Sequence, residues 1–250
     1  MRVSRDDVVR YFSADSVLDH YSKAVSNIGL WKSEEVIFRR VFQPKDTLLE
    51  LGTGTGRIAF GLSEHGYERI LGIDLSREMI RKAREINRLL DRGVSFQVED
   101  ATDLSFGDGL FEGAIFGFNG LMQIPGRINR VQALREIHRV LVPGGWFVCT
   151  THDRELPNHR KFWIRERKLW NKGEQNPMLL DFGDRYEKTS LGELFIHIPT
   201  CNEMRTLFKE AGFRIEADVL RSQLANESQE VREFSDECRF WVVQKRPEGG

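Results

Sequence analysis

The chain has 250 residues, of which 40% are hydrophobic and 30% are charged, and its formal net charge at pH 7 is −1. A chain of this length and composition can bury one sizeable core, and its near-neutral charge excludes recruitment of nucleic acid or an anionic membrane by an overall electric field. The three cysteines are widely spaced, without a C-x-x-C pair, and no apolar segment resembles a secretion signal or a bilayer span. We therefore expect a cytoplasmic protein with reduced thiols and no metal site.

Residues 6–42 have a helical pattern in which aromatic side chains are scattered among charged ones. Residues 47–51 come next as an apolar run that includes Glu50, and glycines stand at 52, 54 and 56. This order predicts a buried parallel strand, a tight turn and a helix. Glycine permits the sharp turn and lets backbone N–H groups come close to a ligand. A dinucleotide fingerprint begun at Gly52 would need glycine at 57, where Arg57 stands, and no Gly-Lys-Thr is present after the turn for a nucleoside triphosphate.

Two further predicted strands end in acidic residues. Residues 68–74 end in Asp74, which lies about twenty residues beyond the glycines, where a strand-end acid can bind both hydroxyls of a ribose. Such an acid can instead cap the next helix, but Ser76 is available as that cap and leaves Asp74 free for the ligand. Residues 94–98 form the next predicted strand, which is followed by Asp100; a solvated turn acid is the alternative, but three strands that end in acids are hard to produce by chance.

The rest of the chain continues the alternation of strands and helices. A fourth strand is predicted at 111–118 and an amphipathic helix at 128–140, with Arg130 among its outward-facing residues. A Leu-Val-Pro-Gly-Gly turn at 141–145 begins a fifth strand. A helix that stops at Gly212 and strands at 213–220 and 238–245 complete the pattern.

In four of these features the chain resembles the class I S-adenosylmethionine-dependent methyltransferases. They are the acidic residue before the glycine run, the acids at 74 and 100, and the Pro-Gly-Gly turn. The resemblance implies a doubly wound α/β fold with helices on both faces of a mostly parallel seven-stranded sheet. Its strand order would be 3-2-1-4-5-7-6, with the last strand antiparallel. It also implies one methyltransferase domain over 1–250, with an N-terminal helical lid at 1–44, a Rossmann-like core at 45–151 and 199–246, and a cap insertion at 152–198.

The same resemblance implies S-adenosylmethionine as the cofactor and S-adenosylhomocysteine as its product. The expected cofactor-binding residues come from the lid, the glycine turn and the ends of the strands, and they are Tyr21, Trp31, Glu50, Gly52, Thr53, Gly54, Gly56, Asp74, Leu75, Met79, Asp100, Ala101, Phe116 and Phe118. Packing of an extra helix on the sheet is the alternative role of Trp31, and several of the apolar residues suit the core equally well.

The acceptor is predicted from the residues at the end of the fourth strand. Methyltransferases that act on the exocyclic amines of bases or on glutamine amides commonly carry Asn/Asp-Pro-Pro-aromatic there, whereas this chain has Phe118-Asn119-Gly120-Leu121. We therefore expect transfer to an oxygen or nitrogen atom of a small molecule. Candidate acceptor-binding residues are Asn119, Gln123, Trp163 and Tyr186. The candidate general bases are His152, then His20 and His197.

Residues 154–170, within the insertion, are basic with interleaved aromatic residues. They suit a cap with a solvated face, which we favour, or a segment that grips phosphates while its rings stack on bases, or one that lies on a membrane. Two functional alternatives therefore stay open: an RNA or protein methyltransferase that uses this segment, and a non-catalytic S-adenosylmethionine-binding protein. A monomer and a homodimer are both compatible with the sequence.

Overall fold

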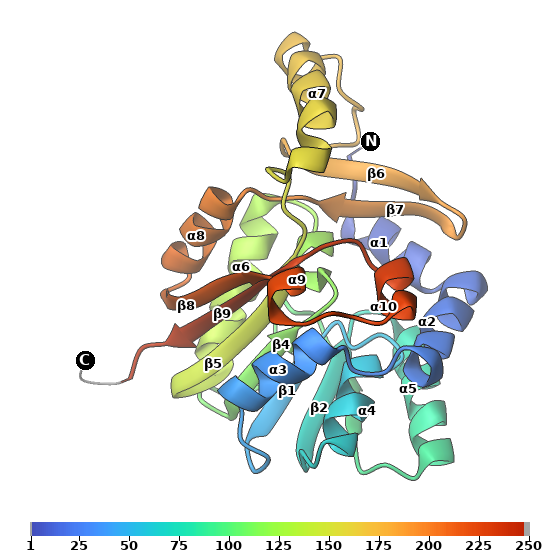
Figure 1. Ribbon diagram of the computed structural model, residues 1–250, viewed down its shortest axis with the longest axis vertical. Helices are drawn as coiled ribbons and strands as arrows, with labels where there is room; N and C mark the ends of the chain where they lie inside the picture. Colours follow the sequence, from blue (N-terminus) through green and yellow to red (C-terminus); the bar gives the residue numbers. More distant parts are fainter. Residues whose placement is uncertain (1, 248–250) are drawn as a thin grey trace.

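The computed structural model describes residues 2–247, and a seven-stranded sheet runs through its centre (Figure 1). The strand order is β3-β2-β1-β4-β5-β9-β8. The strands are β1 Thr47–Leu51, β2 Arg69–Asp74, β3 Ser95–Val98, β4 Phe111–Phe116, β5 Leu141–Thr151, β8 Phe213–Leu220 and β9 Arg239–Lys245. The first five are parallel, and β9 runs antiparallel between β5 and β8. The predicted fold class and strand order are confirmed.

Helices cover both faces of the sheet because successive side chains of each strand point to opposite faces. The helices that pack on the sheet are α3 Lys32–Val41, α4 Arg57–Glu64, α5 Arg77–Leu90, α6 Arg127–Val140 and α8 Cys201–Glu210. Leu49 and Leu51 of β1 belong to the core beneath α6 and α8, whereas Leu48 belongs to the core beneath α3, α4 and α5.

Of the N-terminal helices, α2 (Asp15–Asn27) lies beside α5 and α1 (Arg5–Phe12) packs against α2, while the short helices α9 (Arg221–Leu224) and α10 (Gln229–Phe234) lie between β8 and β9 in the chain (Figure 1). Helix α3 instead belongs to the core, since Trp31 just before it and Phe38 within it are each 1% exposed. Trp31 therefore packs within this core.

The insertion after β5 contains the one-turn helix η2 (Pro157–His159), α7 (Arg160–Lys172) and a hairpin of β6 (Asp184–Thr189) and β7 (Gly192–His197). This hairpin contacts α1 and the one-turn helix η1 (Gly120–Gln123). The insertion is also bound through Arg130, whose guanidinium pairs with Asp181 at 2.9 Å and donates to the Ile124 carbonyl. The prediction that Arg130 faces solvent is wrong, because this partner buries its side chain completely.

Candidate active site

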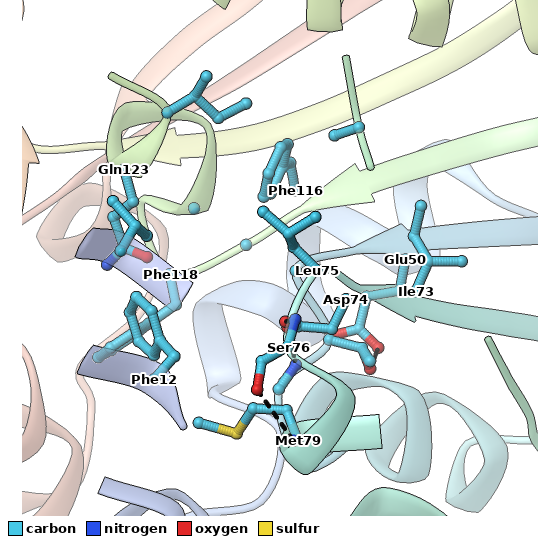
Figure 2. A pocket seen from close by; sticks show the side chains of 18 of the residues that line it. Phe12, Glu50, Ile73, Asp74, Leu75, Ser76, Met79, Phe116, Phe118 and Gln123 are labelled. Carbon is cyan, nitrogen blue, oxygen red and sulfur yellow. Dashed lines mark hydrogen bonds between the residues drawn. The ribbon is translucent and has the colours of Figure 1, made fainter. Parts of the chain in front are cut away.

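A cavity of about 350 Å³ lies where β1, β2 and β4 end, closed on another side by residues of α1 and α2 (Figure 2). Its volume is in the range of sites for small organic ligands. The carboxyl ends of adjacent parallel strands meet at one edge of a sheet, so the turns after these strands all reach the cavity.

The glycine turn brings bare backbone to the cavity. Gly52 and Gly54 have φ of +63° and +56°, a region that favours glycine. A Cβ atom at Gly52 would lie 2.7 Å from the Phe116 ring, whereas one at Gly54 would face open space, with Met79 Sδ nearest at 3.9 Å. Gly56 is not among the residues that line the cavity. A Cβ atom at Gly56 would instead meet the Phe60 ring at 2.6 Å. Gly56 therefore permits close packing between helix and sheet and is not placed to touch a ligand.

Asp74 at the end of β2 holds the turn in place. Its Oδ2 accepts the Gly54 N–H at 2.8 Å and its Oδ1 accepts the Ser76 N–H at 2.9 Å. Ser76 caps α5 by accepting the Met79 N–H, as predicted, and this bond is dashed in Figure 2. Burial raises the pKa of Asp74, and the two N–H groups oppose that rise. Each carboxylate oxygen can accept a second hydrogen bond, so Asp74 supports the turn and still has capacity for a ligand.

Two more polar groups of β1 and its turn are buried in the lining. Glu50 is 3% exposed, accepts a hydrogen bond from the Thr53 hydroxyl at 2.6 Å, and has a pKa that burial raises to about 8. The Thr55 hydroxyl is buried without a hydrogen-bond partner in the described part of the chain. A buried polar group normally has a partner, so the Thr55 oxygen is suited to a polar group of a ligand.

Asp100, just after β3, lies at the edge of the cavity and is already bonded on both oxygens. Its Oδ1 accepts from the amide and hydroxyl of Thr102, and its Oδ2 accepts from Arg5 of α1 at 2.8 Å. Burial opposes ionisation, but these hydrogen bonds prevail and hold the pKa of Asp100 below its ordinary value. The N-terminal helix thus reaches across the opening to the end of β3.

Aromatic rings form the end of the cavity away from Glu50 and Asp74. Figure 2 shows Phe12 and Phe118 on one side of the cavity and the two carboxylates on the other. The ring centroid of Phe118 lies 4.9 Å from that of Phe234 and 6.0 Å from that of Tyr21, and the centroids of Tyr21 and Phe12 are 5.9 Å apart. Phe118 has a φ of +48°, which is strained for a bulky residue and is typical of functional sites. The cavity is therefore polar at one end and aromatic at the other.

The structure brings most of the predicted site residues together. Those that line the cavity are Tyr21, Glu50, Gly52, Thr53, Gly54, Asp74, Leu75, Met79, Asp100, Ala101, Phe116, Phe118 and Gln123. Those that do not are Trp31, Gly56, Asn119, Trp163, Tyr186 and the histidines at 20, 152 and 197. Trp163 and Tyr186 lie in the insertion on α7 and β6, where they contact other rings of the insertion.

None of the three predicted bases lies in the cavity lining. His152 Nδ1 is 3.0 Å from the Glu237 carbonyl, which can only accept, so Nδ1 carries the proton and Nε2 accepts from the Asn119 amide at 3.2 Å. His197 is fully buried between Asp184 and Glu203, each 2.7 Å from a ring nitrogen. His20 stacks on Phe234, with 5.4 Å between ring centroids. All three rings are therefore engaged with other residues of the protein, outside the cavity lining.

Several lining residues were missed from the sequence: Arg5, Phe12, Thr55, Arg57, Ile124, Pro125, Asn129 and Phe234. Thr55 was recognisable, because it stands inside the glycine run. Phe234 carries no such signal, since it lies on α10, far along the chain from the other lining residues, and reaches the cavity only through the fold.

Comparison with known sequences agrees with this geometry. Residues 48–145, which include the glycine turn and the strand-end acids, match the family described as a methyltransferase domain. The chain is 28% identical over 191 residues to the ubiquinone/menaquinone biosynthesis C-methyltransferase UbiE of Rickettsia massiliae, covering 74% of each chain. The UbiE enzyme of Desulfotalea psychrophila is 40% identical over 104 residues, which is 41% of this chain and 39% of that one.

The matched domain and the UbiE relatives support a class I S-adenosylmethionine-dependent methyltransferase. The enzyme class and the cofactor, S-adenosylmethionine, are those implied by the resemblance in the sequence. Solved structures show the same fold: an S-adenosylmethionine-dependent methyltransferase of Methanosarcina mazei has a TM-score of 0.68 at 23% identity, covering 85% of this chain and 98% of that one. The PH0226 protein of Pyrococcus horikoshii has a TM-score of 0.65 at 22% identity, and the match covers 94% of this chain and 95% of that one. No helix of this methyltransferase within residues 2–247 has the length and apolar character needed to cross a bilayer.

Proposed function

We propose that this methyltransferase transfers the methyl group of S-adenosylmethionine to a ring carbon of a small, largely apolar aromatic acceptor. The observation that carries the proposal is the aromatic end of the cavity, where Phe12, Tyr21, Phe118 and Phe234 offer faces and edges to a flat ring. The choice of carbon is based on the relatives, which are named C-methyltransferases of ubiquinone and menaquinone biosynthesis. It differs from the oxygen or nitrogen acceptor predicted from the sequence.

The polar end of the cavity has groups that suit the cofactor. In the proposed arrangement Asp74 accepts the ribose hydroxyls, Asp100 and Ala101 contact the adenine, and the turn at Gly52 and Gly54 faces the amino-acid part. The open space above Gly54 and the unpartnered Thr55 hydroxyl support this placement. The bound cofactor supplies an electrophilic methyl group. The protein then has to hold the acceptor in line with the bond that breaks and exclude water.

The chemistry of the lining also favours a carbon acceptor. The cavity lining, within residues 2–247, contains no histidine that could remove a proton from a neutral alcohol or an ammonium group. A ring that bears an ionised hydroxyl needs no such base for attack, because its negative charge makes the ring carbons nucleophilic. The new carbon–carbon bond forms as the sulfur–methyl bond breaks and the thioether leaves, and the ring then loses its proton to water.

Product analysis tests this function. The enzyme is incubated with S-adenosylmethionine labelled in its methyl group and with size-matched phenols, quinols, amines and a short RNA, and the product is examined by nuclear magnetic resonance. We expect the label on a ring carbon of a phenol or quinol. A label on oxygen, on nitrogen or on the RNA would refute the carbon proposal, and cofactor binding without transfer to any acceptor would indicate the non-catalytic alternative.

A separate prediction concerns Phe234, which is one of the rings at the aromatic end of the cavity. Truncation in Phe234→Ala removes apolar surface worth roughly 1.5–3 kcal/mol when buried, so we expect kcat/KM for the acceptor to fall by about tenfold or more while cofactor affinity is unchanged. The matched control is Phe106→Ala, which removes a half-buried ring outside the cavity that packs on Phe111. Equal losses in the two variants would mean that Phe234 acts through stability and does not contact the acceptor.

Because the pKa of Glu50 is raised, we expect its carboxyl group to release a proton when the cofactor binds. With a pKa of about 8, Glu50 is mostly protonated at pH 7, and the positive charges of the cofactor lower that pKa. We therefore expect release of about one proton per S-adenosylmethionine at pH 7, fading above pH 8 because the carboxylate is then already ionised. The measurement is calorimetry in buffers of different ionisation enthalpy.

Two variants decide whether Glu50 is the source of that proton. Glu50→Gln should bind without proton release, whereas Glu68→Gln, which changes an exposed acid outside the cavity, should behave as the wild type. Proton release that persists in Glu50→Gln would assign the proton to another group.

A further inference from the structure

Helix α7 carries a row of cations on its outer side. Lys161, Arg165, Lys168 and Lys172 succeed one another at intervals of four, three and four residues, which places them along one face of the helix. All four side chains are exposed, and the equally exposed Arg160 flanks the row. Figure 1 shows α7 projecting from the body of the protein, beyond the β6–β7 hairpin.

The charge of this face is not neutralised by the protein. Helix α7 contains six cations and a single acid, Glu166, and therefore has a formal charge of +5 in a chain whose net charge is −1. Lys161, Lys168 and Lys172 form no ion pair within residues 2–247, and the one contact of Arg165 with Glu166 is long, at 3.4 Å. A concentrated charge of this kind attracts an anionic partner.

The aromatic residues of the helix lie on its inner side and hold it to the insertion. Trp163 is 8% exposed and lies 5.7 Å from Phe182, and the Trp170 ring lies 5.8 Å from the same phenylalanine. The Arg185 guanidinium covers Phe162 at 4.4 Å. These rings are therefore already in use and offer no platform on which nucleic-acid bases could stack.

Ile164 lies on the cationic face and is 51% exposed. On the helix it stands between Arg160 and Lys168 in the row of exposed residues. At the surface of an anionic membrane the cations of this face would meet lipid phosphates, and the exposed Ile164 side chain beside them would reach the acyl boundary.

We propose that the outer face of α7, formed by Arg160, Lys161, Ile164, Arg165, Lys168 and Lys172, binds the surface of an anionic phospholipid membrane. None of these residues lines the cavity, so the binding is independent of the acceptor and of the cofactor. If the acceptor is apolar, such binding brings the enzyme to the place where apolar molecules collect.

The test is sedimentation of the full-length protein with vesicles. Vesicles of phosphatidylcholine containing phosphatidylserine should bind the protein, binding should weaken as salt is raised, and pure phosphatidylcholine vesicles should not bind it. A variant with Lys161→Gln, Arg165→Gln, Lys168→Gln and Lys172→Gln should lose at least ~100-fold in partition, since each cation near such a surface contributes about fivefold. Glutamine keeps a helix propensity close to that of lysine and arginine.

Two controls separate the face from general effects. The variant with Lys32→Gln, Arg40→Gln, Lys45→Gln and Lys209→Gln removes the same charge from exposed sites elsewhere and should bind as the wild type. Ile164→Gln should lose roughly tenfold, and Leu89→Gln, which changes an 84% exposed leucine of α5, should lose nothing. Retained binding in the α7 variant, equal losses in the control, or binding to pure phosphatidylcholine would overturn the proposal. So would a preference of this face for a short RNA over the anionic vesicles.

Discussion

Asp74→Ala is expected to lower the affinity for S-adenosylhomocysteine by at least ~100-fold. The carboxylate has two proposed tasks: it accepts the ribose hydroxyls, and it holds the glycine turn through its bond to the Gly54 N–H at 2.8 Å. Hydrogen bonds to a charged group are worth about 1.5–3 kcal/mol each, and the loss of two of them accounts for the predicted change. Titration calorimetry with S-adenosylhomocysteine measures it directly.

Two controls make the Asp74 result specific. Ser76→Ala removes the cap of α5 and should cost about 1 kcal/mol of stability with little change in affinity, because Ser76 lies beside Asp74 but is not proposed to bind the ribose. Asp19→Ala removes a 64% exposed carboxylate from the surface of α2 and should change neither quantity. If Asp74→Ala bound the ligand as the wild type does, Asp74 would have no place in the cofactor site.

The second large effect concerns stability. The Arg57 guanidinium makes two bonds of 2.7 Å with the Glu34 carboxylate, and the two side chains are 9% and 1% exposed. Arg57 begins α4 directly after the glycine turn, and it also donates to the Gly29 carbonyl at 2.7 Å. This buried pair therefore joins the N-terminal segment to the turn. Arg57→Met leaves the Glu34 charge buried with the Trp31 N–H but without its counter-ion, and should lower the free energy of unfolding by about 3–5 kcal/mol.

The neighbouring residue pair provides the matched control. Arg39 and Glu35 form an ion pair of 2.9 Å on the surface of α3, with 63% and 35% of the side chains exposed. Arg39→Met should change the free energy of unfolding by less than about 1 kcal/mol, because an exposed pair is screened by water. Urea denaturation compares the two variants. Similar losses in both would show that Arg57 and Glu34 are not energetically coupled, and recovery of stability on adding Glu34→Gln to Arg57→Met would support the coupling.

The sequence by itself determined the sheet and the polar end of the cavity. Strands 47–51 and 68–74 were recognisable because their apolar runs end in an acid or a glycine turn, and these signals are local in the chain. Parallel strands bring their carboxyl ends to one edge, so Glu50, Asp74 and Asp100 had to lie near one another once the strand order was known. The glycine at 54 is explained by the need for a positive φ, which few other residues accept.

Only the tertiary structure decided which side chains face the acceptor and which are held elsewhere. Phe12, Phe118 and Phe234 come from three distant segments and meet only through the packing of α1 and α10 at the end of β4. His152 follows the fifth strand as predicted, but only the fold brings Asn119 and the Glu237 carbonyl to its two ring nitrogens. The composition of α7 likewise did not show whether its aromatic residues face the protein or solvent. In the structure Trp163 and Trp170 face inward because they pack against Phe182. The cations of the helix are therefore left on its solvent-exposed side. Such contacts depend on partners far apart in the chain, and no local pattern encodes them.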